Sequence, residues 1–270
     1  MFELEFMQRA FFAGLLVAIT CPIIGTFLVV RKQSLIGDGL GHIAFAGVSA
    51  GWLLSWQPVL SAALFTVVGA CAIEKVRSLK SDFTDMVLAI FFYCGMGLAI
   101  VLASFKSSGG VSLTSFLFGS IVTVSVEDLY IIASMGMVTL LAIVVFYRQL
   151  IFLAFDEETA RISGLPVNGL NLLLSILTAL TIVVSMRIVG LLLVAAMMVI
   201  PVACALPWRH GFFGTMLLAV AMAVVAVVVG LTASFYLNLA PGGTIVLTAG
   251  SLFVLSEVFC YFSKKQKRVC

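Results

Sequence analysis

The sequence predicts an all-α, polytopic membrane protein built as a helical bundle, and three observations carry this prediction. Hydrophobic residues make up 63% of the 270 residues and charged residues only 10%, whereas a soluble domain is nearer half apolar and a quarter charged. The mean hydropathy is +1.24. The apolar residues also gather in runs of about 20, the length an α-helix needs to cross a bilayer. We therefore expect residues 1–270 to form a single transmembrane domain in contact with lipid.

About nine hydrophobic runs are candidates for membrane-spanning helices. Only Ser185-Met186-Arg187 interrupts the apolar residues between 168 and 206, so a bent or re-entrant arrangement there would lower the count to eight. The apolar patch 116–124 is too short to span and is expected to be interfacial or re-entrant. The nine runs are 7–30, 36–55, 58–76, 85–105, 127–147, 168–186, 188–206, 211–235 and 243–262.

The basic residues mark the ends of these runs and predict the topology. Cytoplasmic loops of membrane proteins carry an excess of lysine and arginine. With the N-terminus outside, most basic residues, including the tail 263–270, fall on the cytoplasmic side, and only Arg9, Lys106 and Arg187 fall on the other. We therefore predict that the N-terminus is outside and the C-terminus inside. The net charge of +3, spread in this way, predicts no nucleic-acid partner.

The sequence contains no motif typical of an enzyme. It has no phosphate-binding G-x-x-x-x-G-K-[ST] and no recognisable catalytic triad. Its six cysteines are scattered without a C-x-x-C, which argues against a disulfide framework or a thiolate metal site. Any ATP hydrolysis linked to this chain is expected on another subunit, and no permanently bound cofactor is predicted.

Asp38 and His42 are the candidate metal ligands. An ionisable group inside a membrane segment is costly and marks a functional site by default. Residues four apart share one face of a helix, and a carboxylate with an imidazole suits a borderline metal such as zinc or manganese. The two lie about 9 and 15 Å along the helix from Lys32. Because zinc usually takes four ligands, water or a second copy of the pair would have to complete the site.

A simpler interpretation of this pair stays open. Asp38 could cap a helix introduced by Gly37, and His42 could bond a neighbouring carbonyl. Glycines at 37, 39, 41, 47 and 51 also permit close approach between helices, so we expect the helix to be central rather than lipid-facing.

A short cytoplasmic helix is predicted near 156–165. Asp156, Glu157 and Glu158 suit its first turn, Gly164 its end, and Pro166 prevents continuation. So short a helix is unstable alone and should dock on something. It is either an ordinary surface helix or a contact site for a cytoplasmic partner.

Four motifs resemble those of the permease subunits of zinc and manganese ABC importers, with the zinc branch most similar. The resemblance covers nearly the whole chain, and the Gly-Asp-x-x-x-His core of the first motif is the most specific part. Many relatives carry an aspartate just before the second motif, where this chain has Ser112-Leu113-Thr114-Ser115. The motifs are RKQSLIGDGLGHIAFAGVSAG at 31–51, LFGSIVTVSVEDL at 117–129, LTALTIVVSMRIVGLLLVAAMMVIPVACA at 177–205 and APGGTIVL at 240–247.

The resemblance implies a homodimeric permease in the plasma or inner membrane. It implies two cytoplasmic ATPase subunits and an extracytoplasmic metal-binding protein as partners. The transported ion would be zinc rather than manganese, on a path lined by Asp38 and His42. The residues expected to couple the permease to its ATPase are Asp156, Glu157, Glu158, Ala160, Arg161 and Gly164.

Two other functions remain as alternatives. A permease for a metal chelate would need a wider pore with few ionisable ligands, which the Asp38/His42 pair disfavours. A secondary carrier driven by an ion gradient would often show internal repeats, and none is evident in the sequence.

Overall fold

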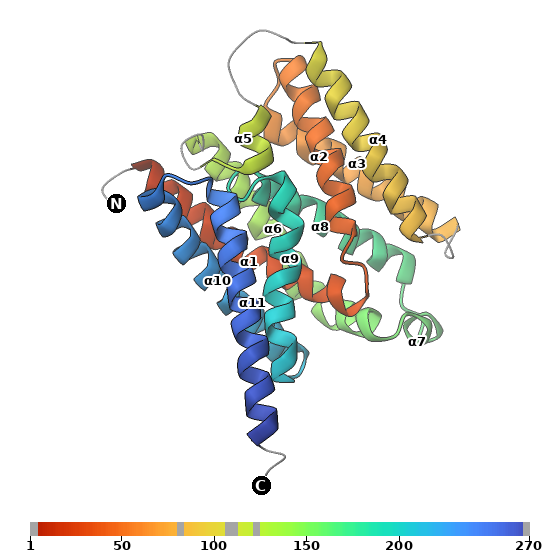
Figure 1. The fold of residues 1–270 in the computed structure, drawn as a ribbon. Coiled ribbons are helices and arrows are strands. Elements are labelled where there is room, and N and C mark those ends of the chain that lie inside the picture. The colour runs from red at the N-terminus through yellow and green to blue at the C-terminus, as the bar shows by residue number, and fades with distance from the viewer. Residues whose placement is uncertain (1–4, 80–83, 106–112, 121–124, 267–270) are drawn as a thin grey trace.

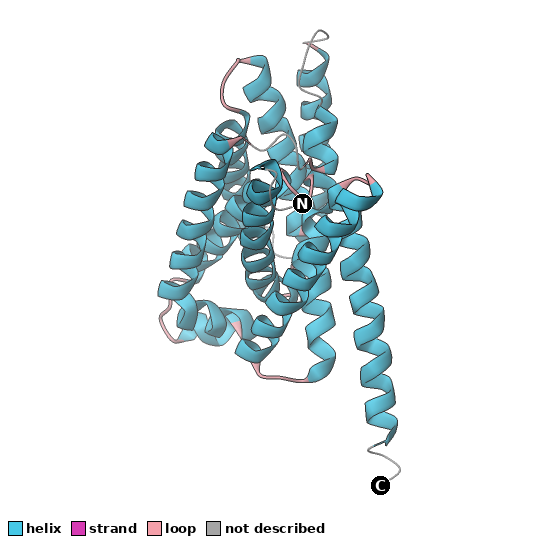
Figure 2. Cartoon of the chain, turned by 90° about the vertical axis from the view of Figure 1, so that its left-hand side faces the viewer, coloured by secondary structure: helices cyan, strands magenta, loops and turns pink. Residues whose placement is uncertain are grey.

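The computed structural model describes residues 5–79, 84–105, 113–120 and 125–266, and these form helices and turns without a strand (Figure 2). Figure 1 shows their arrangement. The helices are α1 (Glu5–Val30), α2 (Ile36–Leu53), α3 (Pro58–Leu79), α4 (Thr84–Ser104), α5 (Leu113–Phe118), α6 (Val126–Phe155), α7 (Glu157–Ile162), α8 (Val167–Met186), α9 (Leu191–Ala205), the 3-10 turn η2 (Leu206–Trp208), α10 (Phe212–Leu237) and α11 (Pro241–Gln266).

Each of the nine predicted hydrophobic runs contains a helix, and eight helices of the described part are long and apolar enough to cross a membrane. The weak boundary in the sequence is a real break, because α8 ends at Met186 and α9 begins at Leu191. The helix outside the group of eight is α2, with 18 residues. Its Asp38, His42 and glycines lower its hydropathy. The number of candidate spanning helices among the described residues is thus eight because α2 is less apolar, and not because the runs on either side of Arg187 form one bent segment.

Helix α2 is central in its part of the bundle, as its glycines predicted. It packs against α3, α4, α8 and α9, and α2, α3 and α4 form one group in Figure 1 while α1, α10 and α11 form another. A Cβ on Gly47 would lie 2.7 Å from the Ala62 Cα of α3, and one on Gly95 of α4 would lie 3.0 Å from the backbone nitrogen of Ile43. The backbones of α3 and α4 therefore pack directly against the backbone of α2 at these glycines.

Polar contacts concentrate at two opposite ends of the bundle, and we name each end by its buried arginine. At the Arg187 end, the turn 187–190 contacts the segment after α5, and the Ser120 amide donates to the Arg187 carbonyl at 3.2 Å. At the Arg31 end, the turn 31–35 lies beside α7. Helix α1 starts and α11 ends at opposite ends of the bundle (Figure 1). This arrangement fits the predicted grouping of loops, and the side facing the cytoplasm stays a prediction.

Several predicted boundaries need correction or lie outside the described residues. The last predicted run, 243–262, starts two residues later than the helix it contains, because α11 already begins at Pro241. Proline is well suited to the first position of a helix. Helix α11 also continues to Gln266, so the first residues of the predicted tail 263–270 are helical, while 267–270 lie outside the description. Lys106, Ser112 and residues 121–124 of the predicted interfacial patch also lie outside it.

Candidate functional site

Asp38 lies in the first turn of α2 and does not cap it. The helix begins at Ile36, and the N-cap residue Leu35 makes no side-chain cap hydrogen bond. A capping residue must stand before the first helical residue, because its side chain accepts from backbone amides further along. The interpretation of Asp38 as a helix cap is therefore wrong. Its half-buried side chain is left available for another role.

His42 is held by packing rather than by hydrogen bonds. Its ring meets the Phe92 ring of α4 edge-on, with 4.1 Å between centroids, and Gly95 brings α4 against its backbone. The buried Nδ1 atom has no hydrogen-bond partner in the described part of the chain. Leaving such an atom unpaired costs about 1–3 kcal/mol. The alternative in which His42 bonds a neighbouring carbonyl is therefore not seen at Nδ1, which has no hydrogen bond that a ligand would have to displace.

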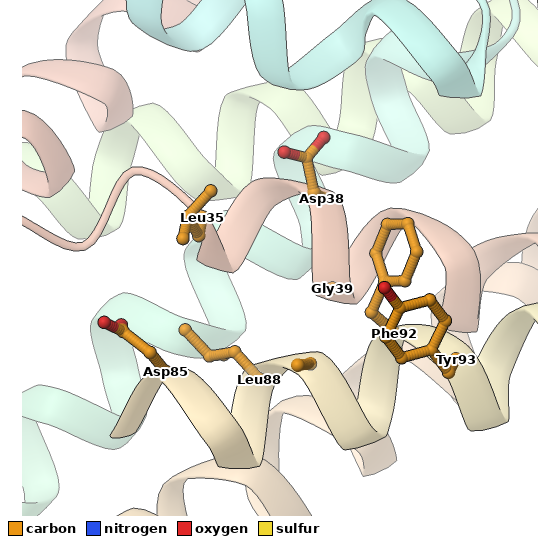
Figure 3. Close-up of a pocket in the computed structure, with 8 residues that line it drawn as sticks. Leu35, Asp38, Gly39, Asp85, Leu88, Phe92 and Tyr93 are labelled. Atoms are coloured by element: carbon orange, nitrogen blue, oxygen red, sulfur yellow. The ribbon is translucent and has the colours of Figure 1, made fainter. Parts of the chain in front are cut away.

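A pocket of about 200 Å³ lies between the start of α2 and α4. Figure 3 shows that Asp38 comes from α2 and points away from α4, while Asp85 lies at one end of the pocket. The two carboxylates do not point toward each other. Nothing in the sequence singled out Asp85, because it lies near a helix start where a carboxylate is common. The lining residues are Leu35, Asp38, Gly39, Asp85, Leu88, Ala89, Phe92 and Tyr93.

The described residues of one chain do not form a complete metal cage. They contain no group of three or more histidine, cysteine, aspartate or glutamate side chains placed to hold an ion together. Asp38 and His42, the two ligands predicted from the sequence, are therefore not joined by a third such side chain of the described residues. Closed four-ligand sites are typical of structural zinc, and the described residues contain no such site.

The predicted short helix is present as α7, and it docks on its own chain. Asp156 is the N-cap and accepts a hydrogen bond from the Thr159 amide at 2.9 Å. The hydrogen bond from the Thr159 hydroxyl is the main cause that lowers the pKa of the Asp156 carboxyl. Ala160 is fully buried against Leu153 and Leu170. Gly164 ends the segment in a left-handed conformation, with φ of +81°, as predicted.

The remaining residues of the α7 segment leave an accessible surface. Glu157 is half-buried, whereas Glu158 and Arg161 are exposed. Two large apolar side chains flank the same segment, with Phe155 65% and Ile162 81% exposed. The docked side of α7 is thus small and apolar, and its free side combines charges with apolar groups.

A buried arginine connects α7 to the turn before α2. Arg31 donates to Glu157 at 2.7 Å and to Asn171 of α8 at 2.6 Å. Burial lowers the pKa of the Arg31 guanidinium, and the charge of Glu157 opposes that change. From the sequence, Arg31 was only one of the basic residues that mark the topology, because nothing in the sequence pairs it with a residue more than a hundred positions away.

A second buried arginine organises the opposite end. Arg187 forms an ion pair with Asp128 at 2.9 Å and lies over the Phe116 ring, 4.4 Å from its centroid. Asp128 also completes a capping box with Ser125 at the start of α6. In the sequence, Arg187 stood out because it falls on the non-cytoplasmic side of the predicted topology, where basic residues are rare. Its charge is paired here, which explains why it is tolerated on that side.

Comparison with known proteins identifies the family of this fold. A model of the ABC 3 transport family matches residues 3–260. The chain belongs to the ABC 3 transport family. The eight long apolar helices among its described residues and this membership make it a multi-pass protein of the cell membrane.

Relatives of this family member match over nearly their whole length. A "probable metal transport system membrane protein" of Treponema pallidum is 37% identical, covering 94% of this chain and 96% of the relative. The manganese transport system membrane protein MntC of Halalkalibacterium halodurans is 33% identical, with 97% and 89% covered. The manganese import system permease protein ScaB of Streptococcus gordonii is 30% identical, with 94% and 91% covered.

Two solved structures share the fold of this family member. PsaBC from Streptococcus pneumoniae, in complex with Fab, matches with a TM-score of 0.84 and 31% identity, covering 94% of this chain and 91% of that one. An inward-facing metal-chelate type ABC transporter matches with a TM-score of 0.73, covering 93% and 85%. At 14% identity the second likeness concerns the fold alone.

Proposed function

We propose that this chain is the permease subunit of an ATP-driven importer of a divalent transition metal, with Asp38 and His42 on the path of the ion. The observation that carries this proposal is the buried, unpartnered Nδ1 of His42 on a glycine-rich central helix, one turn from Asp38. Family membership and the names of the relatives support the class of transporter. The chelate permease and the ion-driven carrier are therefore less well supported.

We propose the other members of the transporter from the functions that this chain alone does not supply. Two ligands per chain are too few for a tight site, so we propose a homodimer in which both copies of Asp38 and His42 face one pore. Nucleotide hydrolysis belongs to separate ATPase subunits, which dock on the exposed surface of α7. An extracytoplasmic metal-binding protein delivers the ion at the Arg187 end. ATP-driven movement of α7 then opens the path alternately to the two sides.

Zinc and manganese are both candidate ions. The imidazole of His42 favours a borderline metal such as zinc, whereas the carboxylate of Asp38 suits manganese. The zinc preference expected from the sequence stays a prediction, and the relatives named for manganese support that ion.

Metal uptake by the assembled complex tests the proposal. The permease is expressed with its ATPase and binding protein, and uptake of zinc and of manganese is measured in cells or proteoliposomes. We expect Asp38→Ala and His42→Ala to lower uptake by more than about tenfold while the complex still assembles. His210→Ala is the matched control, because His210 is the other histidine of the chain and is exposed. Normal uptake in both site variants would remove the pair from the mechanism.

A further inference from the structure

Arg31 occupies the point where the α7 segment meets the metal-site helix. Its side chain is only 5% exposed. One terminal nitrogen donates to the Asn171 amide oxygen at 2.6 Å, and the other donates to the Glu157 carboxylate at 2.7 Å. Asn171 also donates to Glu157 at 3.4 Å. Three side chains from the α1–α2 turn, α7 and α8 therefore form one closed network.

The chemistry of this network makes it a firm link. Hydrogen bonds in which donor and acceptor are both charged are shorter and stronger than neutral ones. A buried arginine cannot lose its partner cheaply, because its charge would then be left without compensation. Arg31 and Glu157 are therefore expected to move together when α7 moves.

The turn after Arg31 passes such a movement to α2. The Arg31 amide donates to the Phe27 carbonyl of α1 at 3.1 Å, and the Gln33 amide donates to the Leu28 carbonyl at 2.8 Å. The Ile36 amide donates back to the Gln33 carbonyl at 3.1 Å. The turn is thus hydrogen-bonded to the end of α1 and to the start of α2. Asp38 stands in the first turn beyond it.

We propose that Arg31 is a positioning residue that links α7 to α2, so that displacement of α7 by the ATPase shifts Asp38 and His42. The proposal rests on the function proposed above. It adds the physical connection between the site of ATP-driven movement and the metal ligands. Arg31 neither binds the ion nor contacts the ATPase; it acts through Glu157 on one side and through its own turn on the other.

A nearby ion pair provides a matched control. Arg77 donates to Glu74 at 2.9 Å, and its side chain is 12% exposed. Both residues belong to α3, and Glu74 also accepts from the Ser175 hydroxyl of α8 at 3.2 Å, but no hydrogen bond or ion pair in the described part of the chain joins the pair to α7. Arg77→Gln therefore removes a buried arginine at the same end of the bundle without breaking the link from α7 to α2.

The experiment measures metal ions carried per ATP hydrolysed by purified permease–ATPase complexes in proteoliposomes. For Arg31→Gln we expect this ratio to fall by roughly 5- to 150-fold, the range of typical coupling between sites, while complex yield and ATPase rate are preserved. Arg77→Gln should keep the ratio of the unsubstituted complex. Exchange of the two charges, Arg31→Glu with Glu157→Arg, should restore much of the ratio that Arg31→Glu alone loses.

Other outcomes overturn the proposal. An unchanged number of metal ions carried per ATP in Arg31→Gln would overturn it. So would a parallel loss of complex yield, ATPase activity and transport in Arg31→Gln, if exchanging the two charges fails to restore the ratio. If Arg31→Gln does not assemble, Glu157→Gln replaces it, because Glu157 is 43% exposed and glutamine keeps its shape while removing the charge that pairs with Arg31. An unchanged ratio in Glu157→Gln then overturns the link. If the unsubstituted and Arg77→Gln complexes carry no divalent metal, the proposed function itself fails.

Discussion

His42 owes its position to the helix beside it. Phe92 meets its ring edge-on and Gly95 admits α4 against its backbone, so the ring is oriented while Nδ1 stays without a partner. Asp38 and His42 were identified from the sequence because ionisable residues are conspicuous in an apolar run. Their surroundings were not predictable, since Phe92 and Gly95 are ordinary residues of a membrane helix and only the tertiary contact gives them a role.

His42→Asp tests whether the imidazole determines metal preference. Replacing nitrogen by a second carboxylate makes the ligand set harder, which favours manganese over zinc. We expect zinc uptake to fall more than manganese uptake, by about tenfold in the ratio of the two. Competition between labelled zinc and manganese in the same cells measures that ratio. His210→Asp should leave it unchanged, and an equal loss of both ions in His42→Asp would contradict a role of His42 in selection.

At the scale of elements, positions of helices were predictable and connections between them were not. Length and hydropathy located all nine runs, and the Asp156–Gly164 segment was predicted correctly because capping and stop signals are local. The links Arg31–Glu157 and Asp128–Arg187 join elements distant in sequence. Neither composition nor hydropathy predicts which of these distant charged residues will form a pair. The sequence showed only that Arg187 is an exception to the predicted topology, and the structure shows that its charge is paired with Asp128.

Arg187→Gln tests the contribution of the link at the Arg187 end. Asp128 is 3% exposed and would lose the partner that compensates its buried charge. Breaking a buried pair on one side costs about 3–5 kcal/mol, so the midpoint of thermal unfolding of the purified permease should fall clearly. Arg9→Gln is the control, because the Arg9–Glu5 pair is exposed and such pairs contribute about 0–1 kcal/mol. Equal stability of the two variants would show that the Arg187 pair contributes little.

For the whole molecule, the two polar ends give the predicted topology a direct test. Glu127 is exposed at the Arg187 end, and Ser163 is exposed just after α7. In a chain freed of its own cysteines, Glu127→Cys should react with a membrane-impermeant maleimide in intact cells. Ser163→Cys should react only after the cells are permeabilised. The opposite pattern would invert the predicted orientation and place α7 outside the cell, away from any ATPase.

The composition of α2 has a consequence for how the protein is made. An aspartate within a membrane helix opposes its insertion, and α2 carries a histidine and several glycines besides Asp38. Its principal partners α3 and α4 follow it in the chain. While α2 leaves the ribosome it therefore lacks the surfaces that later shield it. The helix that carries the proposed metal ligands is expected to reach its final depth only after the segments synthesised behind it have joined the bilayer.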